Sequence, residues 1–359
     1  MAREAEETYW PEPRKNPDLT GHGEAEKAFL DSLHSGRLPH AWLICGPQGI
    51  GKATLAFRFA RHLLAGKSAP SLFAAEEAGS LAIDRDSPIF KRVASGGHAD
   101  LMTVEIGADP KSGKMRSEIV VDDIRGVSEF LHMTPAEGGY RVVVVDSADA
   151  MNRNAANALL KILEEPPPQA VLLLVCHAPG RLPATIRSRC RKLMLHPLAD
   201  AEVASLLARY LPEVPDDDRA ALVKLAEGSP GLALALAQEG GLEVYREMIG
   251  LLSGRANAQA LQRFCEKSAR GAEGFAVVSR LFLWWLARAI RLAAEGKAEE
   301  IVTGEKAALA RIAGARGLDR FAALWEKASR LMARADSVNL DRKQVMMSAF
   351  LELESEAAR

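Results

Sequence analysis

The sequence predicts an α/β domain with a parallel sheet, followed by a small helical domain and an all-helical C-terminal domain. Three observations support this prediction. Short apolar runs alternate with amphipathic helical segments through the first half of the chain, which is typical of a parallel sheet covered by helices. After about Pro197 the strand-like runs end. Residues 255–355 then carry apolar residues at spacings of three and four, which is the helical period.

The strands and helices of the first half follow one another in a regular order. Four apolar runs predict buried strands, and three segments between them predict helices, the second of which we expect to be capped by Asp122. The last of these helices stops at three consecutive prolines, which cannot continue it. The strands are expected at 41–45, 101–106, 140–145 and 171–176, and the helices at 52–64, 122–132 and 153–163. A polar turn is expected at 109–114.

Length and composition limit the number of domains and the class of protein. The chain has 359 residues and a formal net charge of −1. This length predicts two or three domains, because single cores stop growing near ~250–300 residues. The near-zero charge argues against binding of nucleic acid or membranes through overall charge. We expect a flexible N-terminus at 1–15, a nucleotide-binding domain at 16–196 with an insertion at 65–100, a helical lid domain at 197–252 and a helical domain at 253–359.

Cysteine usage predicts reduced thiols and no zinc site. The four cysteines are far apart and none forms a CxxC pair, which argues against a zinc ribbon and a disulfide framework. We expect each to be a small buried side chain; they are Cys45, Cys176, Cys190 and Cys265. The N-terminus lacks the apolar core of a signal peptide, and the apolar stretch at 281–286 is too short for a membrane span. The protein is predicted to be cytoplasmic.

A glycine-rich segment lies between the first strand and the following helix. Gly46, Gly49, Gly51 and Lys52 match most of the P-loop pattern in the context that this motif requires. Its glycines let backbone N–H groups converge on phosphate, and the lysine reaches the β- and γ-phosphates. The sequence therefore predicts a P-loop. The residue after the lysine is Ala53, where a P-loop needs a hydroxyl for Mg²⁺.

The remaining groups for metal binding and hydrolysis are incomplete. Thr54 comes one residue too late, about 100° further round the helix. Asp146 ends the strongest strand, where a metal-holding aspartate is expected. Its neighbour is Ser147 instead of a glutamate that could activate water, and we expect Asp149 to be an N-cap. We therefore predict a residual nucleotide site of Gly46, Gly49, Gly51, Lys52, Thr54 and Asp146, with no metal site and no required cofactor.

Three arginines follow the last predicted strand, at Arg187, Arg189 and Arg191. One interpretation is a solvated basic turn. The other is an arginine finger, which stabilises charge on a phosphate bound to another subunit. A chain unable to hydrolyse ATP can still supply such a residue in trans.

Two further segments make the resemblance to a family specific. These are Leu163-Glu164-Glu165-Pro166-Pro167 and Thr185-Ile186-Arg187-Ser188-Arg189-Cys190. Together with the P-loop they resemble the bacterial clamp-loader subunits of the AAA+ class, and within that class the delta-prime family of DNA polymerase III. The resemblance covers residues 16–200 strongly and the helical remainder only in general architecture.

The resemblance implies an AAA+ domain, a helical lid and a C-terminal collar domain. It also implies partners: ATPase subunits of the gamma/tau type and a delta subunit in a hetero-pentameric ring, the sliding clamp, and primer–template DNA through the complex. The Ser-Arg-Cys arginine of the family, which serves an adjacent ATPase site, falls on Arg189. A sensing arginine of motor subunits falls on Gly231, and no cysteine stands in the insertion where relatives carry a zinc module.

The sequence leaves three hypotheses open. The chain is a non-hydrolysing clamp-loader subunit, an active AAA+ ATPase, or a direct DNA-binding module. Retained Lys52 and Asp146 favour an active ATPase, whereas Ala53 and Ser147 argue against hydrolysis; residual binding of ATP or ADP stays open. Trp284 and Trp285 could stack on single-stranded DNA, but a helix core or subunit interface is the favoured interpretation. Near-neutral charge argues against the DNA-binding module.

Overall fold

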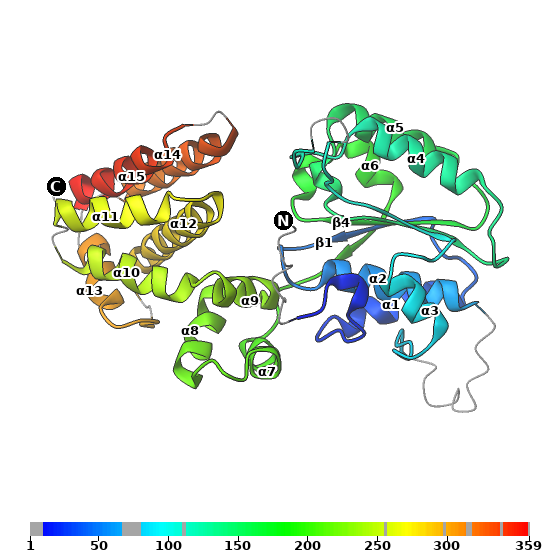
Figure 1. Ribbon diagram of the computed structural model, residues 1–359, viewed down its shortest axis with the longest axis horizontal. Coiled ribbons are helices and arrows are strands. Elements are labelled where there is room, and N and C mark those ends of the chain that lie inside the picture. Colours follow the sequence, from blue (N-terminus) through cyan, green and yellow to red (C-terminus); the bar gives the residue numbers. More distant parts are fainter. Residues whose placement is uncertain are drawn as a thin grey trace. The chain divides into compact units, whose positions relative to one another are not determined.

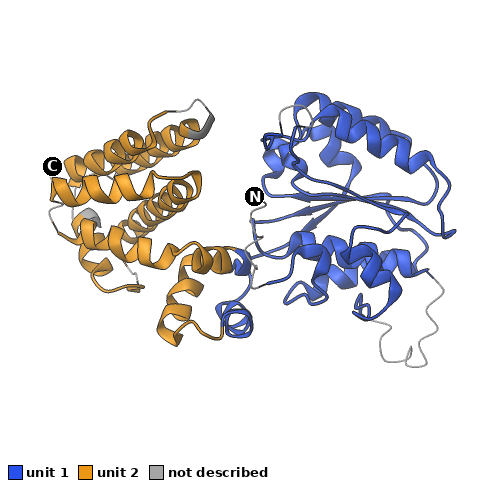
Figure 2. Cartoon of the chain, viewed as in Figure 1, with its two compact units in different colours: residues 1–211, 227–231 blue, residues 212–226, 232–359 orange. Residues whose placement is uncertain are grey.

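The computed structural model describes residues 10–66, 80–109, 113–254, 257–296, 299–313, 318–337 and 340–357. The chain divides into two compact units (Figure 2). Unit 1 comprises residues 1–211 and 227–231, and unit 2 comprises residues 212–226 and 232–359. The expected flexibility of 1–15 falls partly on 1–9, and the expected insertion partly on 67–79, which lie outside the described residues. The same holds for 110–112 of the expected polar turn.

Unit 1 is built on a five-stranded sheet in the order β2-β3-β4-β1-β5, with every neighbouring pair parallel. The strands are β1 (Ala41–Cys45), β2 (Leu101–Val104), β3 (Arg141–Val145), β4 (Ala170–Cys176) and β5 (Arg191–Met194). The four strands expected from the sequence are confirmed. The fifth, β5, was missed, because Arg191 and Lys192 are exposed at the sheet edge and give no apolar run. Charged side chains are common on edge strands.

Helices cover both faces of this sheet (Figure 1). On one face lie α1 (Gly23–His34), α2 (Lys52–Ala65) and α3 (Pro88–Ala94), and on the other lie α4 (Val121–His132), α5 (Arg153–Glu164) and α6 (Ala184–Arg189). Short 3-10 turns are η1 (Pro13–Lys15), η3 (Ala148–Ala150) and η4 (Pro179–Arg181), and α7 (Asp200–Tyr210) ends the first stretch of unit 1. The predicted fold class of a parallel α/β sheet followed by helical regions is confirmed.

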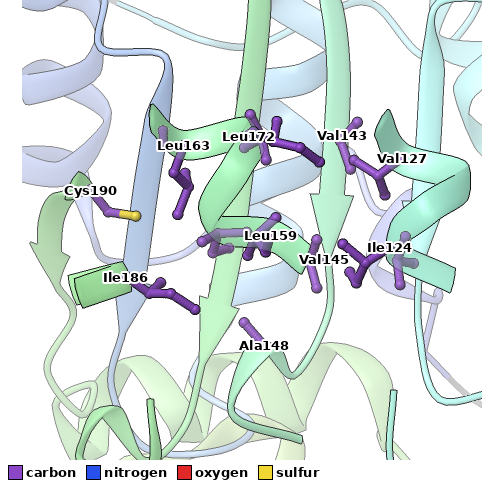
Figure 3. Packing of buried hydrophobic residues seen from close by; sticks show 14 of the residues in the cluster. Ile124, Val127, Val143, Val145, Ala148, Leu159, Leu163, Leu172, Ile186 and Cys190 are labelled. Atoms are coloured by element: carbon purple, nitrogen blue, oxygen red, sulfur yellow. The ribbon is translucent and has the colours of Figure 1, made fainter. Parts of the chain in front are cut away.

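The two faces of the sheet are filled by alternate residues of the strands. Leu43 of β1 belongs to the core under α4, α5 and α6, and Leu172 of β4 faces the same core (Figure 3). Trp42 points to the opposite face, where its ring lies 5.4 Å from that of Phe29 and 6.1 Å from that of Phe59. Because both faces are buried, the strands are apolar along their whole length, as parallel strands usually are.

Two helix starts differ from the sequence-based expectation. Asp122 does not cap α4, because the helix begins one residue earlier and its N-cap is Val120. The carboxylate of Asp123 accepts a hydrogen bond from the Val120 backbone N–H at 2.9 Å and so satisfies that helix end. At the start of α5, the side chain of Asn152 accepts from the Ala155 N–H at 3.0 Å. Asp149 is therefore not the N-cap of this helix.

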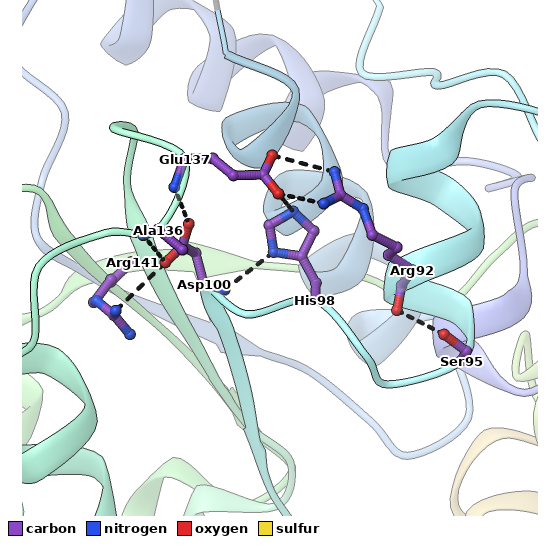
Figure 4. A network of polar contacts seen from close by, with 7 residues as sticks. All are labelled: Arg92, Ser95, His98, Asp100, Ala136, Glu137 and Arg141. Atoms are coloured by element: carbon purple, nitrogen blue, oxygen red, sulfur yellow. Dashed lines mark hydrogen bonds and ion pairs between the residues drawn. The ribbon is translucent and has the colours of Figure 1, made fainter.

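A polar network lies at the amino ends of β2 and β3 (Figure 4). The P-loop lies at the other end of the parallel strands, after the carboxyl end of β1. Buried Asp100 precedes β2 and accepts hydrogen bonds from the N–H groups of Ala136 and Glu137 at 2.8 and 3.0 Å. Its carboxylate also lies 3.5 Å from Arg141, the first residue of β3. Buried polar groups need such partners, and this network joins the loop before β3 to the sheet.

All regular secondary structure in the described residues of unit 2 is helical. Its helices are α8 (Asp216–Ala226), α9 (Pro230–Gln238, of which the first two residues belong to unit 1), α10 (Gly241–Ser253), α11 (Ala258–Ser268), α12 (Ala272–Glu295), α13 (Glu305–Ala313), α14 (Leu318–Ser337) and α15 (Arg342–Ala357). Trp285 is fully buried and the Trp284 ring meets Tyr245 edge-on at 6.0 Å. The core interpretation is confirmed for Trp285, whereas Trp284 is half-buried. Across the residues described, no helix is both long and apolar enough to cross a membrane.

Candidate functional site

The P-loop runs from the end of β1 into α2 and requires glycine by its geometry. Gly46 has φ 149°, and a Cβ there would lie 2.5 Å from the carbonyl oxygen of Leu195. Gly51 has φ 102°, in the region that favours glycine. The predicted P-loop glycines thus lie where the backbone needs them. The loop adjoins the carboxyl ends of β1, β3 and β4, where ligands of parallel sheets bind.

Four successive carbonyl groups of the loop, from Pro47 to Ile50, accept hydrogen bonds from the chain itself. In that order, the donors are Lys52 Nζ, Ser229 Oγ at 2.8 Å, the Gly231 N–H at 2.9 Å and His22 Nε2 at 2.7 Å. The loop is therefore held from outside by its C=O groups. A P-loop contacts phosphate through its N–H groups, so the bonds from Ser229, Gly231 and His22 do not compete with an anion.

The turn at Ser229 and Gly231 lies directly against the P-loop. Ser229 is 4% exposed, and a Cβ on Gly231 would lie 2.9 Å from both the Cα and the carbonyl oxygen of Gly49. This distance is shorter than real Cβ contacts, so a longer side chain would force the turn away. Glycine is therefore the residue that fits at position 231.

Lys52 is buried, with 3% of its surface exposed, and its ammonium group donates to the Pro47 carbonyl. Burial lowers the pKa of Lys52 to about 8, although the nearby carboxylates of Asp146 and Asp149 oppose the shift. The ammonium thus carries an uncompensated desolvation cost. A phosphate group in the loop would relieve that cost, because it would supply the missing negative charge.

The residues present do not fit a firmly held Mg²⁺. Position 53 is an alanine, and Thr54 is buried one position further along α2. Asp146 follows β3 as expected, and burial raises the pKa of its carboxyl group. The hydroxyl ligand that P-loop enzymes place directly after the lysine is absent from position 53, which is an alanine.

Asp149 has a different role from the one expected. Its two carboxylate oxygens accept hydrogen bonds from the backbone N–H groups of His177 and Ala178, at 2.9 and 3.0 Å. Burial alone would raise the pKa of Asp149, but these donors overcome it and the pKa is lowered. The carboxylate joins η3 to the turn after β4. Because both oxygens are engaged and the group stays ionised, Asp149 is poorly suited to take a proton from water.

His177 completes the cluster. It interacts electrostatically with Lys52, Asp146 and Asp149, and its Nδ1 atom is buried with no hydrogen-bond partner among the described residues. Burial and then the Lys52 charge lower the pKa of His177. The available signal was its position directly after β4, because β4 lies between β1 and β3 in the sheet.

Arg189 lies apart from this cluster, on the last residue of α6. Its side chain is 36% exposed, with Nη2 2.8 Å from the Glu164 carboxylate and Nη1 donating to the Thr185 carbonyl at 3.1 Å. In the described part of the chain these partners come from α5 and α6, and none comes from the P-loop. Arg191 is also exposed, whereas Arg187 is half-buried. The structure thus leaves Arg189 accessible to another molecule.

The four cysteines are buried free thiols, which confirms the expectation of small buried side chains. Two of them, Cys45 and Cys176, are register partners on β1 and β4. In the residues that the structure describes, no three histidine, cysteine, aspartate or glutamate side chains gather into a group able to hold a metal ion.

Comparison with known proteins identifies similar chains. Residues 21–199 match the family described as DNA polymerase III, delta subunit. The chain is 40% identical over 212 residues to DNA polymerase III subunit delta' of Pseudomonas aeruginosa and 36% identical over 210 residues to that of Escherichia coli, in each case over 58% of this chain. It is 30% identical over 223 residues, 61% of this chain, to subunit tau/gamma of Haemophilus influenzae. The matches span 59%, 58% and 29% of those proteins' own lengths.

Proposed function

Since the chain belongs to the DNA polymerase III delta-subunit family through residues 21–199, we propose that it is a clamp-loader subunit that does not hydrolyse ATP by itself. In this proposal it helps to load the sliding clamp on primed DNA. It supplies Arg189 in trans to the ATP site of a neighbouring subunit.

The observation that carries the proposal is that both carboxylate oxygens of Asp149, the acidic residue that follows Asp146, are occupied by hydrogen bonds. A hydrolysing site needs a carboxylate free to activate water and a firmly held metal. Here both oxygens of Asp149 bind backbone N–H groups, position 147 is a serine, and position 53 lacks a hydroxyl. Phosphoryl transfer depends on the water-activating carboxylate and the metal ligands for positioning and charge stabilisation. Their loss supports the proposal that this chain does not hydrolyse ATP.

The partners proposed are ATPase subunits of the gamma/tau type, a delta subunit, the sliding clamp and, through the complex, primer–template DNA. A hetero-pentameric ring and a cytoplasmic location belong to the same proposal. The exposed position of Arg189 at the end of α6 supports action on a neighbour, because a guanidinium that serves another subunit's phosphate must reach the surface.

Residual binding of ATP or ADP is part of the proposal, with no required cofactor and no zinc. The buried ammonium of Lys52 and the externally held loop support it. Gly46, Gly49 and Gly51 keep the backbone geometry in which loop N–H groups meet phosphate. Asp146 and Thr54 adjoin this site without completing a metal site.

One observation favours a second candidate, an active motor subunit of the same complex. The glycine frame and Lys52 are intact, and these are the parts that hold the β- and γ-phosphates in P-loop enzymes. The motor candidate requires that a metal be held without the hydroxyl at position 53. It also requires a water-activating base other than Asp149.

Steady-state ATPase assays separate the two candidates. The isolated chain is measured with Mg²⁺ and ATP, and then within a complex assembled with its cognate motor and delta subunits, as wild type and as Arg189→Ala. We expect no turnover by the chain alone and a rate loss of ~10³ or more in the complex for a phosphate-facing arginine. Arg191→Ala, a nearby exposed arginine, is the matched control and should leave the rate unchanged. Turnover by the chain alone that Lys52→Ala abolishes would refute the proposal.

A further inference from the structure

The guanidinium of Arg189 is held from two sides by groups that precede it in the chain. Glu164 Oε1 lies 2.8 Å from Nη2, and the Thr185 carbonyl accepts from Nη1 at 3.1 Å. We propose that Glu164 is a positioning residue for Arg189, which sets the direction in which the guanidinium meets the phosphate of a nucleoside triphosphate on a neighbouring subunit. This inference rests on the proposed function.

The helix ends that carry Glu164 and Arg189 are fixed by packing in the core of unit 1. Glu164 is the last residue of α5 and Arg189 is the last residue of α6. Leu163, next to Glu164, and Ile186, one turn before Arg189, are buried in the same core, together with Cys190, which directly follows Arg189 (Figure 3). Because the core fixes both helix ends, the distance between carboxylate and guanidinium is set by packing and not only by their attraction.

The pair leaves the guanidinium able to bind an anion. Each Nη nitrogen of arginine carries two N–H groups, so the bonds to Glu164 and Thr185 leave a second N–H on each nitrogen. Holding a long side chain in one orientation before it meets its ligand removes part of the ordering cost of binding. Glu164 would therefore raise the rate of the chemical step on the neighbouring subunit.

The Glu164–Arg189 ion pair is strong enough to orient the Arg189 side chain but too weak to hold it permanently against Glu164. The side chains of Arg189 and Glu164 are 36% and 50% exposed, and exposed ion pairs change equilibria by up to about fivefold. An attraction of this size biases the rotamers of Arg189 and still lets the side chain adjust to a phosphate. Loss of Glu164 is thus expected to cost about threefold to fivefold in rate, far less than loss of Arg189 itself.

The experiment measures kcat and KM for ATP in the fully assembled complex. Four forms of the chain are compared: wild type, Glu164→Ala, Arg189→Ala and the double variant. We expect Glu164→Ala to lower kcat about threefold to fivefold without changing KM. It should have no further effect when Arg189 is already alanine, because a residue that acts only through Arg189 cannot matter without it. Glu164→Gln keeps an acceptor for Nη2 and should recover most of the rate.

Glu165→Ala is the matched control, since Glu165 is the exposed neighbour and carries the same charge. It should leave kcat unchanged. The inference is overturned if Glu164→Ala raises the rate, if it slows the double variant by the same factor as the single one, or if Glu165→Ala has the same effect. If Arg189→Ala itself has no effect, the trans role fails, and the positioning role fails with it. If Arg189→Ala slows the complex and Glu164→Ala does not, only the positioning role fails.

Discussion

Replacement of Lys52 by methionine is expected to stabilise unit 1 at neutral pH, although it removes the central residue of the P-loop. The Lys52 ammonium is buried and its pKa falls from 10.5 to about 8. One unit of pKa corresponds to about 1.4 kcal/mol, so burying the charge costs about 3 kcal/mol. Methionine has a similar shape and no charge. It loses the hydrogen bond to Pro47, worth about 1 kcal/mol, which leaves a net gain of about 2 kcal/mol.

The gain must depend on pH in a defined direction. Between pH 8 and 10.5 the folded lysine is neutral while the unfolded lysine still binds a proton, so the stability of the wild type rises with pH. The advantage of Lys52→Met is therefore complete well below pH 8. It shrinks by about 1.4 kcal/mol from pH 7 to pH 9, because the folded lysine loses its proton in this interval while the unfolded lysine keeps it. Above pH 10.5 only the lost hydrogen bond remains, and the variant becomes the less stable form.

The assay is urea unfolding at pH 7 and pH 9, with pulse hydrogen exchange of β1, β3 and β4 peptides as the readout. Peptides from these strands report on unit 1 separately from unit 2, which avoids a two-state treatment of the whole chain. Lys161→Met, on an exposed site of α5, is the control and should change little. A variant that is no more stable than the wild type at pH 7, or whose gain is the same at both pH values, would refute the reasoning.

Two further substitutions test the polar contacts within each unit. Asp149→Ala should destabilise unit 1 by about 2–4 kcal/mol, since it removes two hydrogen bonds to a charged acceptor. Because the pKa of Asp149 is lowered in the folded state, this loss of stability is complete above pH 4 and fades as the pH falls through the folded pKa. Urea unfolding from pH 3 to 7 measures it. Glu305→Gln should destabilise unit 2 by about 3–5 kcal/mol, because the fully buried Glu305 carboxylate accepts from the Tyr245 hydroxyl at 2.5 Å and lies 3.2 Å from Arg288 Nε. Hydrogen exchange of α10 and α12 peptides would detect this destabilisation. Unchanged protection of these peptides would contradict the ion pair of Glu305 with Arg288.

The sheet and its P-loop could be predicted because their signals are local. The β-branched run at 142–145 and the glycine pattern at 46–51 each define a conformation by themselves. The strand β5 carries no such signal, because an edge strand faces water and bears Arg191 and Lys192. Its place follows only from pairing with β1, and that pairing joins residues far apart in the sequence. The division into three domains stays a prediction.

The contacts of the candidate site could not be predicted for the same reason. Asp149 was expected to cap the next helix, which is the commonest local role of an aspartate at that distance. The structure shows instead that it binds backbone groups 28 and 29 positions away. The Glu164–Arg189 pair likewise joins two motifs of the family that the sequence keeps 25 positions apart. Sequence patterns give residue types and spacing, whereas these bonds depend on how α5, α6 and β4 pack.

The hydrogen bonds around the loop also explain why the retained P-loop glycines and lysine do not establish ATP turnover. Gly46 and Gly231 are required by close backbone approaches to Leu195 and Gly49, whether or not a nucleotide is present. His22 and Ser229 bind loop carbonyls, which phosphate does not use. These contacts join the start of α1, the P-loop and the turn before α9 within unit 1. Substitution of the glycines would therefore be costly even in a chain without ATPase activity. Within the described residues neither Ala53 nor Ser147 takes part in such a contact, so the metal and base positions are the ones that discriminate a motor from a non-hydrolysing subunit.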